Sequence, residues 1–457
     1  DFSGILSETI RLLEKDKQIC QRLMRRWDLI SIDEAQDTNY AQFRIIQLIG
    51  GHGNVFMVGD SAQTIYTWRG ARYENIEDFI KDNNATVIEL PLNYRSTPEI
   101  VDVASKLINI NKSKEQTNIK TINKSGPPVR CISAQTPDHE AMIIASTIDK
   151  LVYSEGYKHD QFAVLYRANA MSRALEAAFM NRGVPYQVIG GFSFFKREEI
   201  KDALAMLRFY VNPFDSTSLS RFINKPSHSI GQVTLGKIEK YAIQNKVDLI
   251  SALMNIDSYL KSTAKAEKVK SRAKTIGRIF SKDRSGQDIG SIIDGIVQDL
   301  NYEDWIKTNY DNDAEDRKDS LNELINAAAI ASKSSNTSIV DYLNKIALMT
   351  TADKSSQAGS VSLMTIHASK GLEFPVVFLP RMEEGKIPHA RSCSEEKGIE
   401  EERRLCYVAM TRAEKLLITS YSKQEKIKVG KFLKAKNNRP SRFLFDAGIL
   451  KKDHNDV

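Results

Sequence analysis

Two adjacent carboxylates, Asp33 and Glu34, follow a segment that is typical of a strand, residues 27–32. In a site that hydrolyses a nucleotide, one such carboxylate holds Mg²⁺, mostly through water, and a second orients or deprotonates the attacking water. An Asp-Glu pair after a strand is common, so the pair alone is weak evidence. It becomes informative only if other phosphate-directed residues occur in the same chain.

A second set of chemically active side chains follows another apolar segment, residues 55–58. Beyond its end come the amide of Gln63, the aromatic rings of Tyr66 and Trp68, and the guanidinium of Arg69. An amide beyond the carboxyl end of a strand can contact a phosphate, and aromatic rings can stack on bases. This segment therefore predicts a link between a nucleotide site and a nucleic-acid track. Taken alone, a core strand followed by an ordinary amphipathic turn is an equal alternative.

Two arginines lie at predicted boundaries between elements. Arg95 directly precedes a helix start, where Ser96 and Glu99 fit a capping box and Pro98 fits the first turn. Arg412 lies between a helical pattern and a short strand. Guanidinium groups at such places can neutralise charge that develops on a transferring phosphate. A surface ion pair is the commoner fate of an arginine, so neither residue decides the matter alone.

The segment VSLMTIHASKGLEFPVVFL predicts a strand, a polar loop and a second strand. Its loop offers a hydroxyl, an imidazole and an ammonium in Thr365, His367 and Lys370, a combination that suits phosphodiester contacts. Glu373 can accept a hydrogen bond from a ribose hydroxyl. His367 alone would more often be a satisfied loop histidine than a ligand. No second histidine stands at metal spacing, so we reject zinc.

The totals describe an ordinary globular protein of 457 residues, with 41% hydrophobic and 27% charged residues. The net charge of +7 leans weakly towards a polyanionic partner, because it is spread over a long chain. Four widely spaced cysteines favour reduced thiols and a cytoplasmic location. No apolar stretch is long enough for a membrane span. Because the chain begins with Asp-Phe in a helical pattern, we expect a piece of a longer protein or a processed chain.

The elements that must position these side chains alternate between helices and strands up to about residue 195, which predicts a parallel sheet. Early elements include a helix over residues 5–26, a helix that begins at Thr38 as its N-cap, and a strand over 87–90. From about residue 196 to 350 the pattern is helical and polar, and strands then resume. This predicts an α/β fold that is interrupted by a helical insertion and afterwards completed.

Two polar stretches within and after the helical part need an interpretation. Residues 261–284 contain nine Lys or Arg against two acidic residues. We interpret this tract as a solvated helical face rather than a phosphate-binding surface, which is the less common case. The stretch over residues 353–360 is typical of a linker.

Seven segments occur in an order and at spacings that resemble the successive motifs of superfamily-1 DNA helicases of the UvrD/Rep/PcrA type. They are DEAQD, VGDSAQTIYTWRGA, LPLNYRSTPEI, VLYRANAMSRALE, GGFSFFKREEIKDALAMLR, MTIHASKGLEFPVVFLP and EEERRLCYVAMTRAEKLLI. The resemblance covers nearly the whole chain, and seven ordered motifs are far more specific than any single one.

The resemblance implies two RecA-like parallel-sheet motor domains, the first of them incomplete, with a mostly helical accessory domain inserted in the second. The implied boundaries are 1–98 for the C-terminal part of the first domain, 99–195 and 353–450 for the two segments of the second, 196–352 for the accessory insertion and 451–457 for a tail. The nucleotide would lie between the two motor domains.

The resemblance also implies ATP and Mg²⁺ as the site's ligands. The implied nucleotide roles are Asp33 and Glu34 for Mg²⁺ and the hydrolytic water, Gln63 for sensing the γ-phosphate, Arg95 and Arg412 for phosphate contact, Tyr94 for stacking on adenine, and Glu373 for the ribose. The residues implied to line the DNA track are Tyr66, Trp68, Arg69, Asn169, Thr365 and His367. Stacking suits a motor that must step over all four bases.

The implied activity is that of an ATP-dependent 3′–5′ DNA helicase and single-stranded DNA translocase acting in repair or replication. Its implied partners are single-stranded DNA, junctions of single- and double-stranded DNA, and repair or replication proteins. The segment NKPSHSIGQVTLGKI resembles the family's duplex-binding Gly-Ile-Gly turn, but Ser229-Ile230-Gly231 lacks the first glycine. Phosphate contact by that turn therefore does not follow from the resemblance.

The sequence departs from the family in one respect that matters for chemistry, because it contains no GxxxxGK[ST] motif. Backbone amides and a lysine of that loop normally hold the β- and γ-phosphates. We therefore expect an N-terminally truncated portion of an active helicase that is nearly inactive by itself. The alternative is a hydrolysis-dead, helicase-like module that binds DNA or protein. The joint presence of Glu34, Gln63, Arg95 and Arg412 favours the first interpretation.

Overall fold

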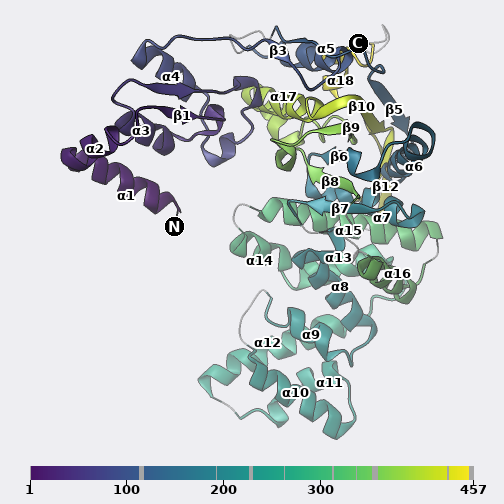
Figure 1. The fold of residues 1–457 in the computed structure, drawn as a ribbon. Coiled ribbons are helices and arrows are strands. Elements are labelled where there is room, and N and C mark those ends of the chain that lie inside the picture. The colour runs from purple at the N-terminus through teal and green to yellow at the C-terminus, as the bar shows by residue number, and fades with distance from the viewer. Residues whose placement is uncertain are drawn as a thin grey trace.

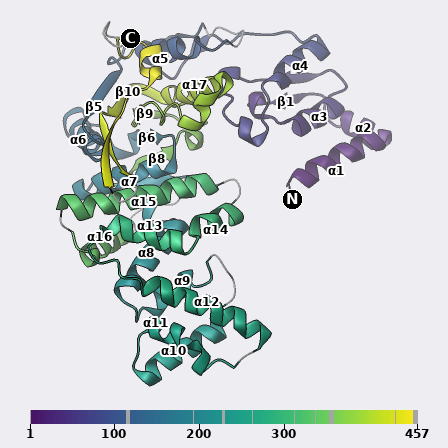
Figure 2. The same ribbon diagram turned by 180° about the vertical axis from the view of Figure 1, so that it is seen from behind.

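The fold is taken from a computed structural model that describes residues 2–112, 118–191, 193–225, 230–261, 263–310, 313–335, 337–352, 359–429 and 432–451. Figures 1 and 2 show three groups of elements: a small group at the N-terminus, a central sheet with its covering helices, and a set of helices at the far side of the sheet. None of the described helices is long and apolar enough to cross a membrane.

The N-terminal unit is a small α/β layer. Its elements are α1 (Phe2–Lys15), α2 (Lys17–Met24), β1 (Ile30–Ile32), α3 (Tyr40–Ile49), β2 (Val55–Met57) and α4 (Glu74–Asn83). The strands β1 and β2 pair in parallel, with Ser31 opposite Phe56. Because parallel strands end at the same edge, Asp33 and Gln63 follow neighbouring strand ends, as the sequence predicted.

The sheet unit has six strands in the order β5-β10-β9-β6-β8-β7, all paired in parallel. The strands are β5 (Arg130–Ala134), β6 (Phe162–Tyr166), β7 (Tyr186–Ile189), β8 (Val361–Thr365), β9 (Phe374–Leu379) and β10 (Ala413–Ser422). The covering helices are α5 (Pro98–Ile108), α6 (Pro137–Glu155), α7 (Ser172–Arg182), α17 (Glu396–Met410) and α18 (Arg442–Asp446).

Both faces of this sheet are buried, as a parallel sheet requires. One apolar cluster joins Leu165, Val377 and Leu417 to α5 and α17, and a second joins Val164 and Phe378 to α6 and α7. The strand β8 lies between β6 and β7, although the whole helical part of the chain precedes it in sequence. The α/β pattern is therefore interrupted and then completed, as predicted.

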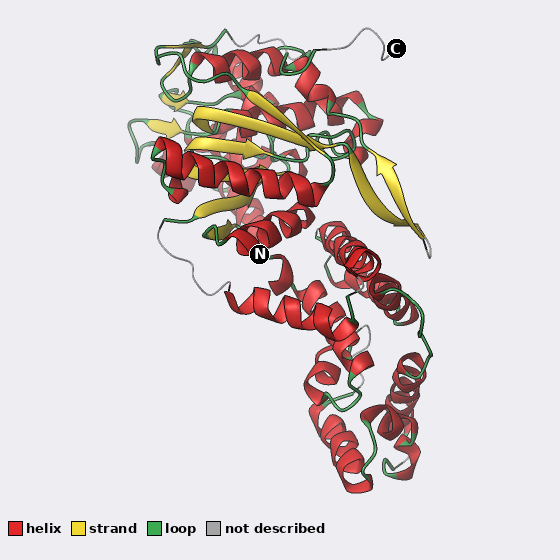
Figure 3. Ribbon diagram, turned by 90° about the vertical axis from the view of Figure 1, so that its right-hand side faces the viewer, coloured by secondary structure: helices red, strands yellow, loops and turns green. Residues whose placement is uncertain are grey.

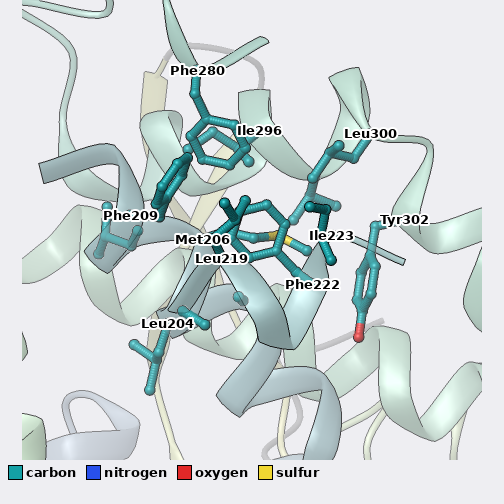
Figure 4. Close-up of a cluster of buried hydrophobic side chains, with 14 of the residues drawn as sticks. Leu204, Met206, Phe209, Leu219, Phe222, Ile223, Phe280, Ile296, Leu300 and Tyr302 are labelled. Carbon is teal, nitrogen blue, oxygen red and sulfur yellow. The ribbon is translucent and has the colours of Figure 1, made fainter. Parts of the chain in front are cut away.

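The helical unit follows β7. Its helices are α8 (Glu198–Val211), α9 (Ser216–Phe222), α10 (Gln232–Asn245), α11 (Leu249–Met254), α12 (Ala264–Phe280), α13 (Ile289–Asp299), α14 (Tyr302–Asn309), α15 (Ala314–Ser335) and α16 (Ile339–Ala352). They enclose an apolar core of their own (Figure 4), in which the ring of Phe209 lies 5.6 Å from that of Phe222 and 5.0 Å from that of Phe280. The domain boundaries near residues 195 and 352 remain predictions.

Two smaller pairs of strands complete the fold. The strands β3 (Leu92–Asn93) and β4 (Lys120–Thr121) pair in parallel beside α5. The strands β11 (Gln424–Val429) and β12 (Phe432–Asn437) form an antiparallel hairpin that projects from the end of the sheet (Figure 3). The sequence analysis did not predict this hairpin.

The predicted helix over residues 5–26 is wrong, because it is two helices. Asp16 interrupts it: its carboxylate accepts hydrogen bonds from the N–H groups of Gln18 and Ile19 and caps the start of α2. The N-cap of α3 is Asn39 rather than Thr38. Asn39 and Gln42 form a reciprocal capping box, which a residue one position earlier could not make.

The predicted strand over residues 87–90 is also absent. Val87, Ile88 and Leu90 are exposed by 61 to 79%, and pairing begins only at Leu92. Four apolar residues favour a strand, but a strand forms only where a neighbour supplies the ladder of hydrogen bonds.

The predicted capping box at the start of α5 is not formed. The Ser96 hydroxyl donates to the carbonyl of Ala413 at 2.6 Å, and Thr97 is the N-cap. Glu99 instead accepts from the N–H of Gly126 at 2.8 Å. Its bonds to Ser125 and Gly126 lower the Glu99 pKa to about 2. A long-range contact thus replaces the local one.

The structure bears differently on the two polar stretches, residues 261–284 and 353–360, that the sequence analysis interpreted. The basic tract forms α12 and the loop after it, where Lys274 pairs with Asp257 and both Lys282 and Arg284 pair with Asp299. These acids neutralise part of the tract. The tract is not solvated throughout as predicted, because Lys270 and Arg284 are buried. Residues 353–358 of the predicted linker lie outside the described residues, and so does Ser229 of the SIG turn.

Candidate nucleotide site and nucleic-acid interface

The acidic pair lies at the exposed end of β1. One Asp33 carboxylate oxygen accepts the Glu34 N–H at 2.9 Å, and the Glu34 backbone adopts a left-handed conformation with φ of 50°. A non-glycine residue rarely adopts this conformation, which costs about 1–2 kcal/mol. Gln36, which is buried, donates to the Glu34 carboxylate at 2.6 Å and accepts the Asp60 N–H at 3.0 Å. Gln36 thereby links the ends of the two strands.

Gln63 and Arg412 meet across the boundary between the N-terminal unit and the sheet unit. Arg412 donates from Nη2 to the Gln63 amide oxygen at 3.3 Å, while Gln63 donates to Asp60 at 2.8 Å. Arg412 is 2% exposed, and its Nε donates to the carbonyl of Val408 at 3.1 Å. Its pKa is lowered to about 10, first by burial and then by the positive charge of Arg95. The guanidinium therefore stays charged at neutral pH.

Arg95 approaches the same place from the segment before α5. Its Nε donates to Glu373 at 2.6 Å, and its Nη1 donates to the carbonyl of Thr411 at 3.4 Å. Glu34 and Glu373 both favour the charged form of Arg412. Two guanidiniums and two carboxylates thus face one another around Gln63. The structure thus brings Glu34, Gln63, Arg95 and Arg412 together, whereas the described contact of Asp33 is with the Glu34 N–H.

Lys370 also reaches this cluster. Its ammonium donates to both oxygens of Asp37 at 2.7 and 2.6 Å and to the carbonyl of Gln63 at 2.8 Å, and it lies 3.6 Å from Glu34. The sequence analysis assigned this ammonium to phosphodiester contacts. In this structure Asp37 of the N-terminal unit pairs with the ammonium, and a phosphodiester contact by Lys370 stays a prediction. Burial raises the Asp37 pKa despite the ion pair.

Beyond Gln63, an exposed tryptophan and a half-buried tyrosine lie close together. The Tyr66 hydroxyl donates to the carbonyl of His367 at 3.0 Å, and Trp68 is 61% exposed. The Arg69 guanidinium lies 4.5 Å from the Trp68 ring centroid and 5.6 Å from that of Tyr66. Burial and Arg167 lower the His367 pKa to about 4, so this imidazole is neutral at pH 7. Tyr66, Trp68, Arg69 and His367 are therefore neighbours.

The remaining predicted contacts are more dispersed. Thr365 is the last residue of β8, two positions before His367, and its hydroxyl accepts the Ala368 N–H at 3.3 Å. The Asn169 amide instead faces the helical unit, where it donates to Asp316 at 3.4 Å. Tyr94 is 68% exposed between β3 and α5. No described contact joins Asn169 or Tyr94 to the group around Trp68.

The family model of the UvrD/REP helicase N-terminal domain matches residues 1–84, and that of the UvrD-like helicase C-terminal domain matches residues 88–424. The chain belongs to the UvrD-like helicase family.

Curated relatives extend over more sequence than this UvrD-like chain. An ATP-dependent DNA helicase PcrA of Staphylococcus epidermidis is 35% identical over 451 residues, which is 97% of this chain and 61% of that protein. The PcrA of Staphylococcus aureus is 34% identical with the same coverage. The UvrD-like chain thus spans about three fifths of the length of these relatives.

The family implies a divalent metal, and the donor set at β1 fits one. Asp33 is exposed at a strand end and is a hard oxygen ligand, which suits Mg²⁺ held largely through water. Within the part of the chain that the structure describes, no group of three or more His, Cys, Asp or Glu side chains could enclose a metal. Asp33 therefore fits an open, water-rich ion and not a protein-enclosed one.

Sequence reasoning missed several residues that organise the UvrD-like site. Gln36 lies inside the DEAQD motif, and its position between the predicted strand ends was the available signal. Arg404 donates from Nε to the carbonyl of Thr64 at 3.2 Å, and the Thr67 hydroxyl donates to Glu401. Both α17 residues lie in a charged helical run that is typical of a solvated face. Their place inside the segment EEERRLCYVAMTRAEKLLI was the available signal.

Proposed function

We propose that the polypeptide carrying this sequence is an ATP-dependent DNA helicase that moves 3′ to 5′ along single-stranded DNA. The observation that carries the proposal is the contact of Gln63 with Arg412 across two units of the fold, on the same segment as Tyr66 and Trp68. A change at a bound phosphate can therefore move the aromatic group directly. The PcrA relatives, which are named as ATP-dependent DNA helicases, support this assignment.

Each nucleotide-facing residue has a role that its position supports. Glu34, next to the end of β1, orients or deprotonates the attacking water, and Asp33 holds Mg²⁺, which neutralises phosphate charge when bound. Gln63 contacts the γ-phosphate, and Arg95 and Arg412 stabilise the charge that develops during transfer. Tyr94 stacks on the adenine, and Glu373 accepts from the ribose. In that state Glu373 exchanges its bond to Arg95 for one to the nucleotide.

The aromatic group provides the DNA track. Tyr66 and Trp68 stack on successive bases, with Arg69 between the rings and the phosphates. Thr365 and His367 contact the backbone of the strand, His367 as a neutral hydrogen-bonding group. Asn169 extends the track towards the helical unit. The substrates are single-stranded DNA and its junctions with duplex DNA, in repair or replication in the cytoplasm.

Hydrolysis also needs a phosphate-cradling loop, which these 457 residues do not contain. The proposed activity is therefore that of a polypeptide that includes such a loop. The 457-residue chain alone should bind DNA but turn over little ATP. The hydrolysis-dead alternative predicts instead that the longest natural polypeptide containing this sequence binds DNA without hydrolysing ATP.

The direct test is the substitution Glu34→Gln in that longest natural polypeptide. Removing the base should lower DNA-stimulated ATP turnover by roughly 10²- to 10⁴-fold, because general-base catalysis contributes about that factor. Binding of labelled single-stranded DNA, measured by fluorescence anisotropy, should stay within about twofold of the wild type. Unchanged turnover in the variant would reject the role of Glu34. Absence of turnover in the wild type would favour the alternative.

A further inference from the structure

The segment between Gln63 and Trp68, here called the lever segment, is held by one helix of the opposite unit. Arg404 of α17 donates to the Thr64 carbonyl at 3.2 Å, and Glu401, one turn earlier, accepts the Thr67 hydroxyl. Residues three apart on a helix lie on the same face. One face of α17 therefore contacts the lever segment at two positions, Thr64 and Thr67, which are three residues apart.

An apolar contact lies between these two polar ones. Ile65, which is 1% exposed, belongs to the same buried cluster as Leu405 and Val408 of α17. The side chain of Ile65 can supply cohesion but no directional restraint. The hydrogen bonds of Arg404 and Glu401 fix how far the lever segment lies along α17 and how it is rotated.

The same helix ends at the nucleotide-facing group. The carbonyl of Val408, in the last turn of α17, accepts from Arg412 Nε at 3.1 Å, and Arg412 contacts Gln63. The helix α17 therefore connects the nucleotide-facing group with the lever segment. At one end it anchors the guanidinium beside the amide, and at the other it holds Thr67, which directly precedes Trp68.

We propose that Arg404 and Glu401 are positioning residues that transmit a movement of Arg412 to the aromatic group through α17. This inference rests on the proposed function, because it assigns a path for the coupling of nucleotide and DNA. Neither residue touches the nucleotide-facing side chains or the exposed rings. Their variants should therefore uncouple DNA from ATP turnover and leave turnover without DNA unchanged.

The burial of Arg404 supports its role in holding the Thr64 carbonyl. Burial lowers its pKa, and the nearby carboxylates Glu401 and Glu400 oppose that shift. A half-buried guanidinium loses hydration, and the Thr64 carbonyl replaces part of it. An arginine placed only for solubility would keep its guanidinium in water. The Arg404 guanidinium instead points at a backbone oxygen of another unit.

The test compares Arg404→Met with Arg404→Lys in the longest natural polypeptide that contains this sequence. Stimulation of ATP turnover by oligo-dT should fall about five- to tenfold in Arg404→Met, within the range of ordinary coupling between sites. Turnover without DNA should stay within about twofold, and the KM for ATP should not change. Arg404→Lys, which keeps a charged donor, should recover part of the stimulation. Thr67→Val, which removes only the hydroxyl, should give a smaller loss of the same kind.

The matched control is Arg403→Met on the same helix. Arg403 carries the same charge and is more deeply buried, but it donates to Asn111 and Asp446 within the sheet unit. If Arg403→Met loses as much DNA stimulation as Arg404→Met, the effect is loss of helix stability and the proposal is overturned. Wild-type stimulation in both Arg404→Met and Thr67→Val also overturns it. A wild type with no DNA stimulation at all overturns the proposed function, and this inference with it.

Discussion

Gln63 makes hydrogen bonds to three residues, two of which lie far away in the chain. Its side chain donates to Asp60 and accepts from Arg412, and its carbonyl accepts from Lys370. An amide side chain can donate and accept at once. A rotation of Gln63 towards a phosphate would therefore break a bond on each side of the boundary. This one residue therefore controls how the two units approach one another at this contact.

The exposed ring of Trp68 allows a prediction about the affinity for single-stranded DNA. Trp68→Ala removes one stacking surface, worth about 1–3 kcal/mol per base, so affinity for single-stranded DNA should fall roughly 5- to 150-fold. Fluorescence anisotropy with labelled oligo-dT measures it. Trp27→Ala is the matched control, because Trp27 is also exposed and also carries an arginine over its ring, at 5.4 Å. An equal loss in both variants would contradict a specific track.

His367 carries a prediction about pH. Its folded-state pKa of about 4 lies below the ordinary 6.5, so the unfolded chain binds more protons between these values. The contribution of the neutral His367 to the free energy of unfolding is complete above about pH 6.5 and is lost as the pH falls towards 4. Urea unfolding at pH 7.5 and at pH 4.5 measures the loss in the free energy of unfolding between the two pH values. This loss should be roughly 2–3 kcal/mol larger in the wild type than in His367→Gln. Equal losses would contradict a buried, neutral imidazole.

At the scale of elements, the end of β2 approaches the turn after β1 very closely. A Cβ at Gly59 would lie 2.7 Å from the Gln36 amide oxygen and 3.0 Å from Ile76 Cδ1. Gln36 in turn holds Glu34. The two strands are short, so this contact, and not the length of the ladder, sets where Glu34 lies relative to Gln63.

Gly59→Ala should therefore displace Gln36 and release Glu34. We expect a loss of about 1–3 kcal/mol in the free energy of unfolding from overpacking, with ATP turnover reduced and DNA affinity retained. Chemical denaturation and a turnover assay on the same preparation check it. Gly236→Ala is the control, since nothing lies within 4 Å of its added methyl group and helix α10 should gain about 0.5–1 kcal/mol. Wild-type turnover in Gly59→Ala would reject the role of this contact.

At the scale of the whole molecule, the helical unit and the sheet unit have separate apolar cores. The chain leaves the sheet after β7, builds the helical unit, and returns as β8 beside β7 (Figure 1). Polar contacts such as those of Arg173 with Glu323 and of Arg391 with Glu315 join the two units, but the apolar cores stay separate. We therefore expect that the helical unit can lose stability without the sheet.

Phe209→Ala tests this separation. Phe209 packs against Phe222 and Phe280 in the helical core (Figure 4), so its truncation should cost about 3–5 kcal/mol there. Differential scanning calorimetry should show one transition move to lower temperature while a second stays in place. Phe378→Ala, in the sheet core, should move the other transition. A single transition that shifts equally in both variants would contradict independent cores.

The sequence by itself determined the parallel sheet, the helical interruption and the convergence of Asp33 and Gln63, because local periodicity reports burial and parallel strands end at one edge. Predictions from local patterns were wrong in two situations. At Ser96 a distant carbonyl took the hydrogen bond of the hydroxyl, and over residues 87–90 no neighbouring strand supplied backbone hydrogen bonds. Residue type also pointed to Arg412 as a phosphate-directed cation.

Only the tertiary structure decided which partners these side chains have. Lys370 pairs with Asp37, Arg404 holds Thr64, and Arg412 meets Gln63 through contacts between segments that are far apart in the chain. Periodicity shows which face of an element is buried, but it carries no information on which distant element covers that face. Hydrogen bonds depend on distance and direction to within fractions of an ångström, and those are set by the packing of whole units.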